Sequence, residues 1–123
     1  MKVLLVEDVD ESRDVLRRML ETFGHRVIEA ANGRDAVRLA LEDRPDLVFM
    51  DLSMPEIDGF QTTGALRAIS RFGRSNLPIV AITAYPETLS KEKAFASGCD
   101  AYLRKPVDLS DLAVVFRRLL PTA

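Results

Sequence analysis

Short apolar runs alternate with longer amphipathic stretches along the whole chain. Five runs rich in valine, isoleucine, leucine and alanine predict strands at Val3–Val6, Val27–Ala30, Leu47–Met50, Ile79–Ile82 and Ala101–Leu103. Most of them are continuous rather than alternating, which is typical of strands buried on both faces of a parallel sheet. The pattern therefore predicts a parallel sheet that is covered by other elements on both sides.

Stretches with helical periodicity separate and follow these runs. They predict helices at Glu11–Phe23, Gly33–Asp43, Gly59–Phe72, Glu87–Ser97 and Leu109–Leu120. Apolar residues recur every three or four positions, so one stripe of each helix is expected to face the core. In the first two helices this stripe contains Val15, Leu16, Met19, Leu20, Phe23, Ala36, Val37, Ala40 and Leu41. The fourth helix is the weakest, since it offers little beyond Leu89, Ala94 and Phe95.

Five strands alternating with five helices predict an α/β fold of the (βα)5 type. Right-handed crossovers place helices on both faces of the sheet, which makes it doubly wound. The 123 residues fit one domain, and we expect residues 1–123 to form it.

Composition narrows the classes of function. A hydrophobic fraction of 47% and a charged fraction of 29% are ordinary for a globular protein, and a net charge of −2 argues against an electrostatic footprint for nucleic acid or anionic membrane. Cys99 is the single cysteine, so an intramolecular disulfide is excluded and a reducing, cytoplasmic compartment is expected. The sequence lacks an apolar run of the roughly 20 residues that a membrane span needs, and its start lacks the features of a signal peptide.

Polar residues follow four of the five predicted strands. Glu7 and Asp8 follow the first strand, Asp51 the third, Thr83 the fourth and Lys105 the fifth by two residues. In open parallel sheets, ligands bind beyond the carboxyl ends of the strands, where the strand order reverses. If the strand order is 2-1-3-4-5, these four ends are neighbours and surround one pocket.

The residue types in that pocket suggest a particular chemistry. Three carboxylates close together resist ionisation, so a cation is needed to offset them. Their hard oxygen atoms favour Mg²⁺ over zinc, and the only histidine, His25, precedes the second strand. Asp51 is the natural nucleophile for a phosphoryl group, which Thr83 and Lys105 can hold by its oxygen atoms.

Four stretches, Val3–Asp8, Met50–Gly59, Ile82–Ala84 and Tyr102–Pro106, resemble the motifs of response-regulator receiver domains of two-component systems. The resemblance covers essentially the whole chain. It implies a flavodoxin-like fold with strand order 2-1-3-4-5. It also implies Mg²⁺-dependent transfer of a phosphoryl group from a phosphohistidine donor to Asp51.

The same resemblance implies roles for individual residues. The metal ligands would be Glu7, Asp8, Asp51 and Ser53, with Glu7 acting mostly through a metal-bound water and Ser53 through its backbone carbonyl. Thr83 and Lys105 would hold the phosphoryl group, and Thr83 would switch together with Tyr102. Lys105 and Pro106 would be joined by a cis peptide. Ser53 and Tyr85 would flank the path of attacking water.

Partners also follow from the resemblance. A histidine kinase or histidine phosphotransfer protein would dock near the first helix. A downstream target would bind the surface of the fourth helix, fifth strand and fifth helix. The protein would be a monomer or a weak, phosphorylation-linked dimer. It would not bind nucleic acid or membrane directly, and it would catalyse only its own phosphorylation and dephosphorylation.

Other interpretations remain open at this point. The acids Glu7 and Asp8 could belong to a plain loop, with Asp10 or Ser12 capping the first helix. Two other functions are a Mg²⁺-dependent phosphatase-like hydrolase, for which so short a chain offers no cap domain, and a phosphorylation-independent interaction module. The sequence does not distinguish a free-standing regulator, a phosphorelay intermediate, and a receiver that belongs to a larger hybrid kinase or regulator.

Overall fold

The computed structural model describes residues 1–52, 59–73, 77–84 and 87–119. Its strands are β1 (Lys2–Val6), β2 (Arg26–Ala30), β3 (Leu47–Asp51), β4 (Ile79–Thr83) and β5 (Ala101–Arg104). Its helices are α1 (Asp10–Thr22), α2 (Gly33–Asp43), α3 (Gly59–Gly73), α4 (Glu87–Ser97) and α5 (Leu109–Leu119). Every predicted element is present, and no end differs from its prediction by more than one residue.

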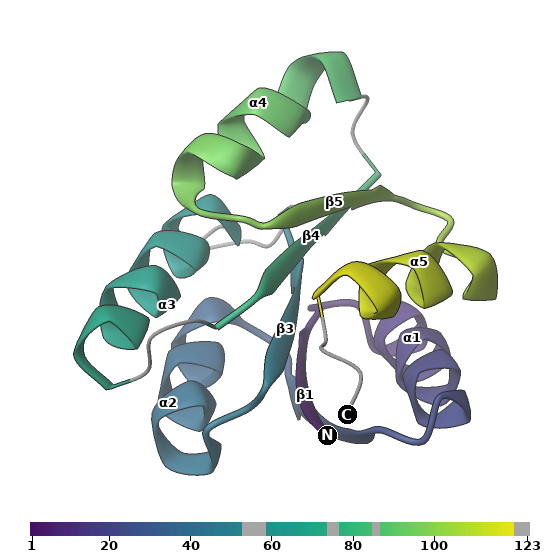
Figure 1. The fold of residues 1–123 in the computed structure, drawn as a ribbon, viewed down its shortest axis with the longest axis horizontal. Helices are drawn as coiled ribbons and strands as arrows, with labels where there is room; N and C mark the ends of the chain where they lie inside the picture. Colours follow the sequence, from purple (N-terminus) through teal and green to yellow (C-terminus); the bar gives the residue numbers. More distant parts are fainter. Residues whose placement is uncertain (53–58, 74–76, 85–86, 120–123) are drawn as a thin grey trace.

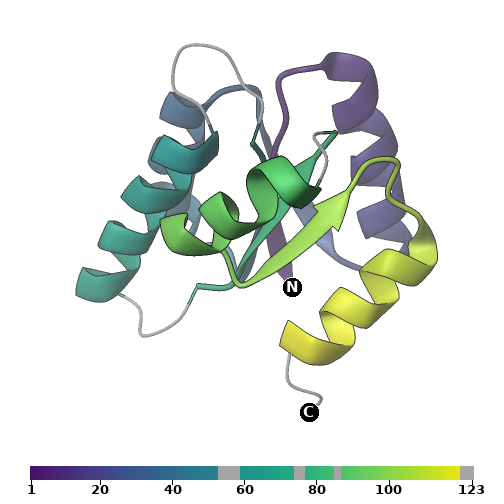
Figure 2. The same cartoon turned by 90° about the horizontal axis from the view of Figure 1, so that it is seen from above.

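The five strands form one parallel sheet in the order β2-β1-β3-β4-β5, as predicted. β1 pairs with both β2 and β3, so the direction of winding reverses there. Helices α1 and α5 cover one face, and α2, α3 and α4 cover the other (Figures 1 and 2). The fold is therefore the doubly wound (βα)5 arrangement, with its switch point between β1 and β3.

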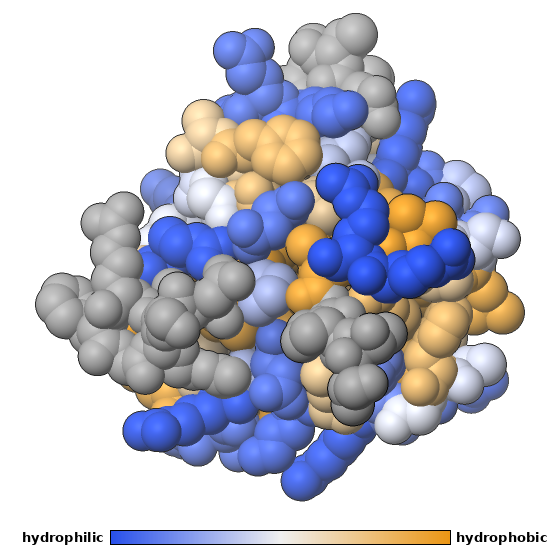
Figure 3. Space-filling model, viewed as in Figure 1, coloured by the Kyte–Doolittle hydropathy of each residue, from blue (hydrophilic) through white to orange (hydrophobic). Residues whose placement is uncertain are grey.

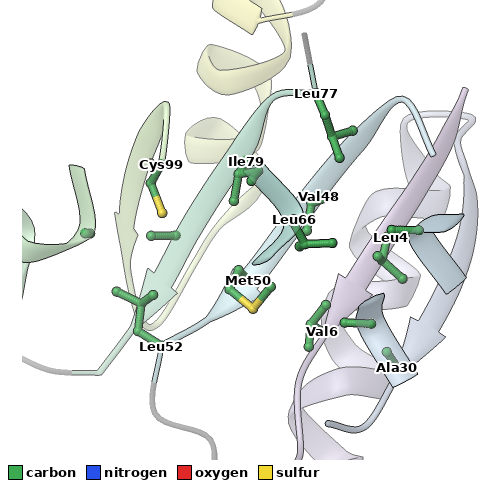
Figure 4. Packing of buried hydrophobic residues seen from close by; sticks show 14 residues of the cluster. Leu4, Val6, Ala30, Val48, Met50, Leu52, Leu66, Leu77, Ile79 and Cys99 are labelled. Carbon is green, nitrogen blue, oxygen red and sulfur yellow. The ribbon is translucent and has the colours of Figure 1, made fainter. Parts of the chain in front are cut away.

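The sheet separates two hydrophobic clusters. Leu4 and Val6 of β1 pack with α2, α3 and α4, as the close view of Figure 4 shows in part, whereas Val3 and Leu5 pack with α1 and α5. All five residues of β3 are buried. The continuous apolar runs in the sequence are thus explained by burial on both faces.

Four described residues of the predicted apolar stripes are wrongly placed by the sequence pattern, and one of them, Phe23, is 36% exposed. Val15 and Leu41 are each 57% exposed, and Phe95 is 43% exposed. The contact between a helix and the sheet is narrower than the stripe, so residues nearer its centre, such as Leu16 and Ala40, are buried instead. These exposed side chains are available for contacts outside the core.

The helix starts differ in how they are capped. Asn32 Oδ1 accepts a hydrogen bond of 2.8 Å from the Asp35 N–H at the start of α2. The N-cap of α1 is Val9, which makes no side-chain cap, so the suggestion that Asp10 caps this helix is wrong. Asp10 is instead the first helical residue and forms an ion pair of 2.7 Å with Arg13.

The amino edge of the sheet is held by hydrogen bonds outside the regular strand pairing. The Arg26 N–H donates to the Met1 carbonyl at 2.9 Å, and the Asp46 N–H donates to the Lys2 carbonyl at 2.8 Å. The Lys2 N–H in turn donates to Asp46 Oδ2 at 2.9 Å. These bonds tie the first residues of β1 to the segments that enter β2 and β3.

Arg67 of α3 makes further contacts at the amino ends of β4 and β5. Its guanidinium donates to the Leu77 carbonyl at 2.9 Å and to the Gly98 carbonyl at 2.6 Å. It also pairs with Asp100 Oδ2 at 2.8 Å, and the same oxygen accepts the Ile79 N–H at 2.8 Å. One side chain thereby joins α3 to the entries of two strands.

On the face drawn in Figure 3, hydrophobic side chains are interrupted by hydrophilic ones. Within the described ranges, none of the helices combines the length and apolar character that crossing a bilayer requires.

Candidate functional site

Three acidic residues meet at the carboxyl edge of the sheet. Glu7 and Asp8 directly follow β1, and Asp51 is the last residue of β3. One carboxylate oxygen from each lies within 4.8 Å of the others. Glu7 is 1% exposed and Asp51 is 4% exposed, whereas Asp8 is half-buried and so borders solvent. The strand order thus brings together the acids that the sequence predicted to be neighbours.

Lys105 brings a positive charge to this cluster. Its Nζ donates a hydrogen bond of 2.8 Å to Glu7 Oε2 and lies 3.8 Å from Asp51 Oδ2. The Lys105 N–H donates to the Thr83 carbonyl at 2.9 Å, which fixes the backbone just beyond β5. The Lys105–Pro106 peptide is cis, as predicted.

Each polar group of Glu7 has a partner. Its N–H donates to the Ala30 carbonyl at 3.1 Å, and its Oε1 accepts the Val9 N–H at 3.3 Å. Burial raises the pKa of the Glu7 carboxyl above its usual range, the hydrogen bond from Lys105 opposes this, and the nearby charge of Asp51 adds to it. Further positive charge at this position would favour the charged form of the Glu7 carboxyl.

The remaining predicted residues divide into two groups. Thr83 is fully buried at the end of β4, and Tyr102 is half-buried on the neighbouring strand β5, against the cluster of α2, α3 and α4. Ser53 and Tyr85 lie outside the described residues, so the structure does not bear on them.

The donor set fits a hard divalent cation. The cluster offers only carboxylate oxygens, and no histidine or cysteine joins it within the described part of the chain. His25 packs on the ring of Phe116, 4.5 Å between centroids, and Cys99 is buried beside Thr63. When ionised, three carboxylates against one ammonium leave two negative charges, which a divalent cation neutralises.

Gly59 determines how closely α3 approaches Asp51. A Cβ atom on Gly59 would collide with the Asp51 carbonyl oxygen and the Leu52 Cα, both of which are backbone atoms. Only glycine fits there without a shift of the backbone that carries Asp51. The sequence offers Gly59 only as the end of a motif and the start of a predicted helix, because its close approach to Asp51 depends on tertiary structure.

Two residues at the site were not singled out from the sequence. Arg13 Nη1 donates to the Glu7 carbonyl at 3.0 Å, and Arg13 Nε lies 3.4 Å from Glu29 Oε1 on β2. An arginine on a polar helix face and a glutamate in an edge strand have many ordinary uses. No local signal identifies this pair.

A groove of about 440 Å³ lies next to Lys105. The segment Lys105–Val107 forms one wall, and α1 side chains between Glu11 and Met19 form the other. Its lining includes Val15, which the helical pattern had assigned to the core. The groove therefore extends from the exposed Val15 of α1 to Lys105 at the edge of the acidic site.

A five-stranded parallel sheet in this order, with an acid cluster at its carboxyl edge, defines the chemotaxis-regulator class of flavodoxin-like folds. Residues 3–117 match the response regulator receiver domain family. Protein PilH of Pseudomonas aeruginosa is 35% identical over 97% of both chains, and the polar-differentiation response regulator DivK of Brucella anthropi is 34% identical over 87% of this chain and 85% of its own.

Solved structures agree with this class. The chemotaxis protein CheY4 of Vibrio cholerae has a TM-score of 0.87 and 31% identity over 97% of this chain and 98% of its own. Another similar structure is the receiver domain of a sensor histidine kinase from Pseudomonas aeruginosa, solved with a magnesium ion coordinated in its active site cleft. It has a TM-score of 0.86 and 34% identity over 96% of this chain and 95% of its own. The chain therefore belongs to the response regulator receiver domain family and is a receiver domain of a two-component system.

Proposed function

We propose that this receiver domain accepts a phosphoryl group on Asp51 from a phosphohistidine donor, in a reaction that requires Mg²⁺. The observation that carries the proposal is the position of Lys105 Nζ, which is 2.8 Å from Glu7 and 3.8 Å from Asp51. An ammonium between two buried carboxylates is well placed to turn toward a new anion on Asp51.

Glu7, Asp8 and Asp51 are the described residues that would hold the metal, since their oxygen atoms lie within 4.8 Å of one another. Bound there, Mg²⁺ supplies neutralisation of the charge that develops on the phosphoryl oxygens. Asp8 is the most exposed of the three acids and provides the side from which ligands enter. The backbone carbonyl of Ser53, predicted as a further ligand, lies outside the described residues.

The transfer itself makes one bond and breaks one. A carboxylate oxygen of Asp51 attacks the phosphorus atom, and the bond between phosphorus and the donor's imidazole nitrogen breaks in line with it. The electron pair of the broken bond stays on the imidazole. Lys105 then shifts its ammonium from Glu7 toward a phosphoryl oxygen, and the Thr83 hydroxyl donates to another.

This movement of Thr83 is the proposed start of the switch. Thr83 is buried at the end of β4, so its displacement toward Asp51 leaves space that the neighbouring Tyr102 can enter from its half-buried position. Tyr102 packs against the helices of its own face of the sheet, and its rotation would alter the α4–β5–α5 surface. Phosphorylation thereby shifts a population between two arrangements.

We assign the groove between α1 and the Lys105–Val107 segment to the phosphodonor. It opens next to Lys105, and its lining combines apolar Val15 and Met19 with Glu11 and Ser12. A histidine kinase or histidine phosphotransfer protein docked there would bring its phosphohistidine to the acid cluster. The downstream target would bind the α4–β5–α5 surface, where Phe95 is 43% exposed.

In this proposal the protein is a cytoplasmic switch without turnover of a separate substrate. A phosphatase-like hydrolase would need a pocket for the rest of its substrate above Asp51. A phosphorylation-independent interaction module would bind its partner equally well without Asp51. The interaction module leaves the convergence of a lysine and three acids at the carboxyl edge unexplained.

The test is intact-mass measurement after incubation with acetyl phosphate or phosphoramidate. Wild-type protein with MgCl₂ should gain one phosphoryl group, whereas wild-type protein with EDTA and the Asp51→Asn variant should gain none. A gain by Asp51→Asn equal to that of wild type would overturn the proposal. Continuous hydrolysis of a generic phosphate ester would favour the hydrolase instead.

A further inference from the structure

We propose that Arg13 is a positioning residue that sets the orientation of the two metal-binding acids after β1. The inference rests on the Mg²⁺ site of the proposed function and deepens it. Arg13 lies on α1, does not belong to the acid cluster, and acts through the backbone between Glu7 and Asp8.

The contact that matters is with one peptide group. Arg13 Nη1 donates to the Glu7 carbonyl at 3.0 Å, and this carbonyl belongs to the peptide that links Glu7 to Asp8. Both neighbours of that peptide carry carboxylates of the cluster. Rotation of the peptide would turn these carboxylates relative to each other, so a donor that fixes the carbonyl fixes the spacing of two ligands.

Arg13 is itself held in place on two other sides. Its Nε lies 3.4 Å from Glu29 Oε1, and its Nη2 lies 2.7 Å from Asp10 Oδ1. Glu29 pairs with Leu5 in the sheet, so its side chain points to the face that α1 covers. The Arg13 side chain is 18% exposed. The guanidinium thus connects the acidic loop to the edge strand β2 and to the first turn of α1.

The charge of Arg13 and its role in positioning the acids predict opposite effects on Mg²⁺ affinity. A positive charge near the acid cluster repels Mg²⁺, so removing it would strengthen metal binding if charge were its only effect. Loss of a group that orients metal ligands weakens binding, typically by about tenfold or more. The direction of the change in Mg²⁺ affinity therefore distinguishes the two roles.

Arg17 provides a matched control on the same helix. It lies one turn further along α1, 3.8 Å from the same Glu29 oxygen, and it also pairs with Asp14 and Glu21. Its described contacts do not include the Glu7 carbonyl. Arg17→Gln removes the same charge and one of the same partners and leaves the contact to the acidic loop intact.

The experiment titrates MgCl₂ into metal-free wild type, Arg13→Gln and Arg17→Gln by isothermal titration calorimetry, with folding checked by circular dichroism. We expect the Mg²⁺ Kd of Arg13→Gln to rise about tenfold and that of Arg17→Gln to stay within about twofold of wild type. In metal-free protein, the Asp8 and Val9 amides of Arg13→Gln should exchange hydrogen faster than those of Arg17→Gln.

An unchanged or lower Kd for Arg13→Gln would overturn the inference, as would equal amide exchange in the two variants. If Arg13→Gln fails to fold, Arg13→Lys replaces it, with a weaker Mg²⁺ affinity expected because a lysine cannot reach all three acceptors at once. Wild-type protein that binds Mg²⁺ but gains no phosphoryl group would overturn the proposed function alone. Wild-type protein that binds no Mg²⁺ would overturn the metal site.

Discussion

Lys105 Nζ is closer to Glu7 Oε2, at 2.8 Å, than to Asp51 Oδ2, at 3.8 Å. The two partners of the shorter contact are 98 residues apart in sequence, so the fold alone brings them together. Glu7 is almost completely buried, whereas Lys105 is 24% exposed at its side chain. The lysine therefore compensates the buried acid and remains within reach of Asp51.

Replacing this lysine should affect both stability and chemistry. Lys105→Met leaves Glu7 buried without its ammonium partner, and we expect a loss of about 1–3 kcal/mol in the free energy of unfolding. Phosphorylation by phosphoramidate should slow by about 100-fold, because a positive charge at the phosphoryl oxygens is lost. Urea unfolding and a mass-spectrometric time course measure these two effects.

Lys2→Met is the matched control for Lys105→Met. Lys2 is also half-buried and donates from Nζ to the Asp43 carbonyl at 3.1 Å, but it lies at the opposite edge of the sheet. The phosphorylation rate of Lys2→Met should equal that of wild type. A rate for Lys105→Met within about twofold of wild type would contradict a role for Lys105 in holding the phosphoryl group.

Gly59→Ala should be poorly tolerated. The added methyl group collides with backbone atoms of Asp51 and Leu52, so the start of α3 or the end of β3 must move. We expect a loss of about 1–3 kcal/mol in stability and a slower phosphorylation of Asp51. Gly64→Ala on the same helix meets nothing within 4 Å and should stabilise the protein by about 0.5–1 kcal/mol. Chemical denaturation measures the free energy of unfolding of both variants, and equal changes for Gly59→Ala and Gly64→Ala would contradict the steric role of Gly59.

Arg67→Met should destabilise the fold without affecting the chemistry of the folded protein. It removes the donor for the Leu77 and Gly98 carbonyls and leaves Asp100 without its ion pair, at a cost of about 2–3 kcal/mol. The Mg²⁺ Kd should not change, because Arg67 acts at the amino edge. Arg38→Met, whose side chain is 54% exposed, is the control and should change stability by less than about 0.5 kcal/mol.

Lowering the pH should reduce the free energy of unfolding through protonation of His25. Burial lowers the pKa of His25 below 6.5, and its Nδ1 is buried with no hydrogen-bond partner among the described residues. The unfolded chain therefore binds a proton before the folded protein does. The stability that comes from burying neutral His25 is therefore fully present above pH 6.5 and is lost as the pH falls below that value.

The variant that tests this is His25→Leu. Urea unfolding at about pH 7.5 and about pH 5.5 should show a smaller fall in the free energy of unfolding for the variant than for wild type. Equal falls in the two proteins would show that His25 does not contribute to the acid sensitivity.

Cys99 should be inert in the folded protein. Burial raises the pKa of its thiol to about 11, despite a contact of 3.9 Å with the Thr63 hydroxyl. Because the thiolate is the reactive form, alkylation by iodoacetamide near neutral pH should be at least about 100-fold slower than in urea-unfolded protein. Thiol labelling followed by mass spectrometry gives both rates, and similar rates would contradict the burial.

The sequence allowed the whole element order to be predicted, because continuous apolar runs and helical periodicity are local properties. The resemblance to receiver domains supplied the strand order, which brings Glu7, Asp8 and Asp51 together. The pattern failed at Val15, Phe23, Leu41 and Phe95, since periodicity defines a stripe on a helix but not how much of it the sheet covers.

Contacts between distant side chains were beyond the reach of the pattern. Nothing near Glu7 indicates that Lys105 donates to it, nor that Arg13 donates to its carbonyl. The same holds for Arg67, whose acceptors lie 10 and 31 residues away. Such contacts depend on the register of strands and the rotation of helices, which tertiary packing determines.

Hydrogen bonds outside the strand pairing join the elements at the amino edge of the sheet, away from the acid cluster. Hydrogen bonds there involve Met1, Lys2, Asp46 and Arg67, and the acids proposed to bind metal and accept the phosphoryl group lie at the opposite edge. Turns at the carboxyl edge can therefore differ in length and composition without loss of the contacts that stabilise the sheet. A molecule divided in this way can acquire new partners through exchange of those turns, while the geometry around Asp51 is inherited intact.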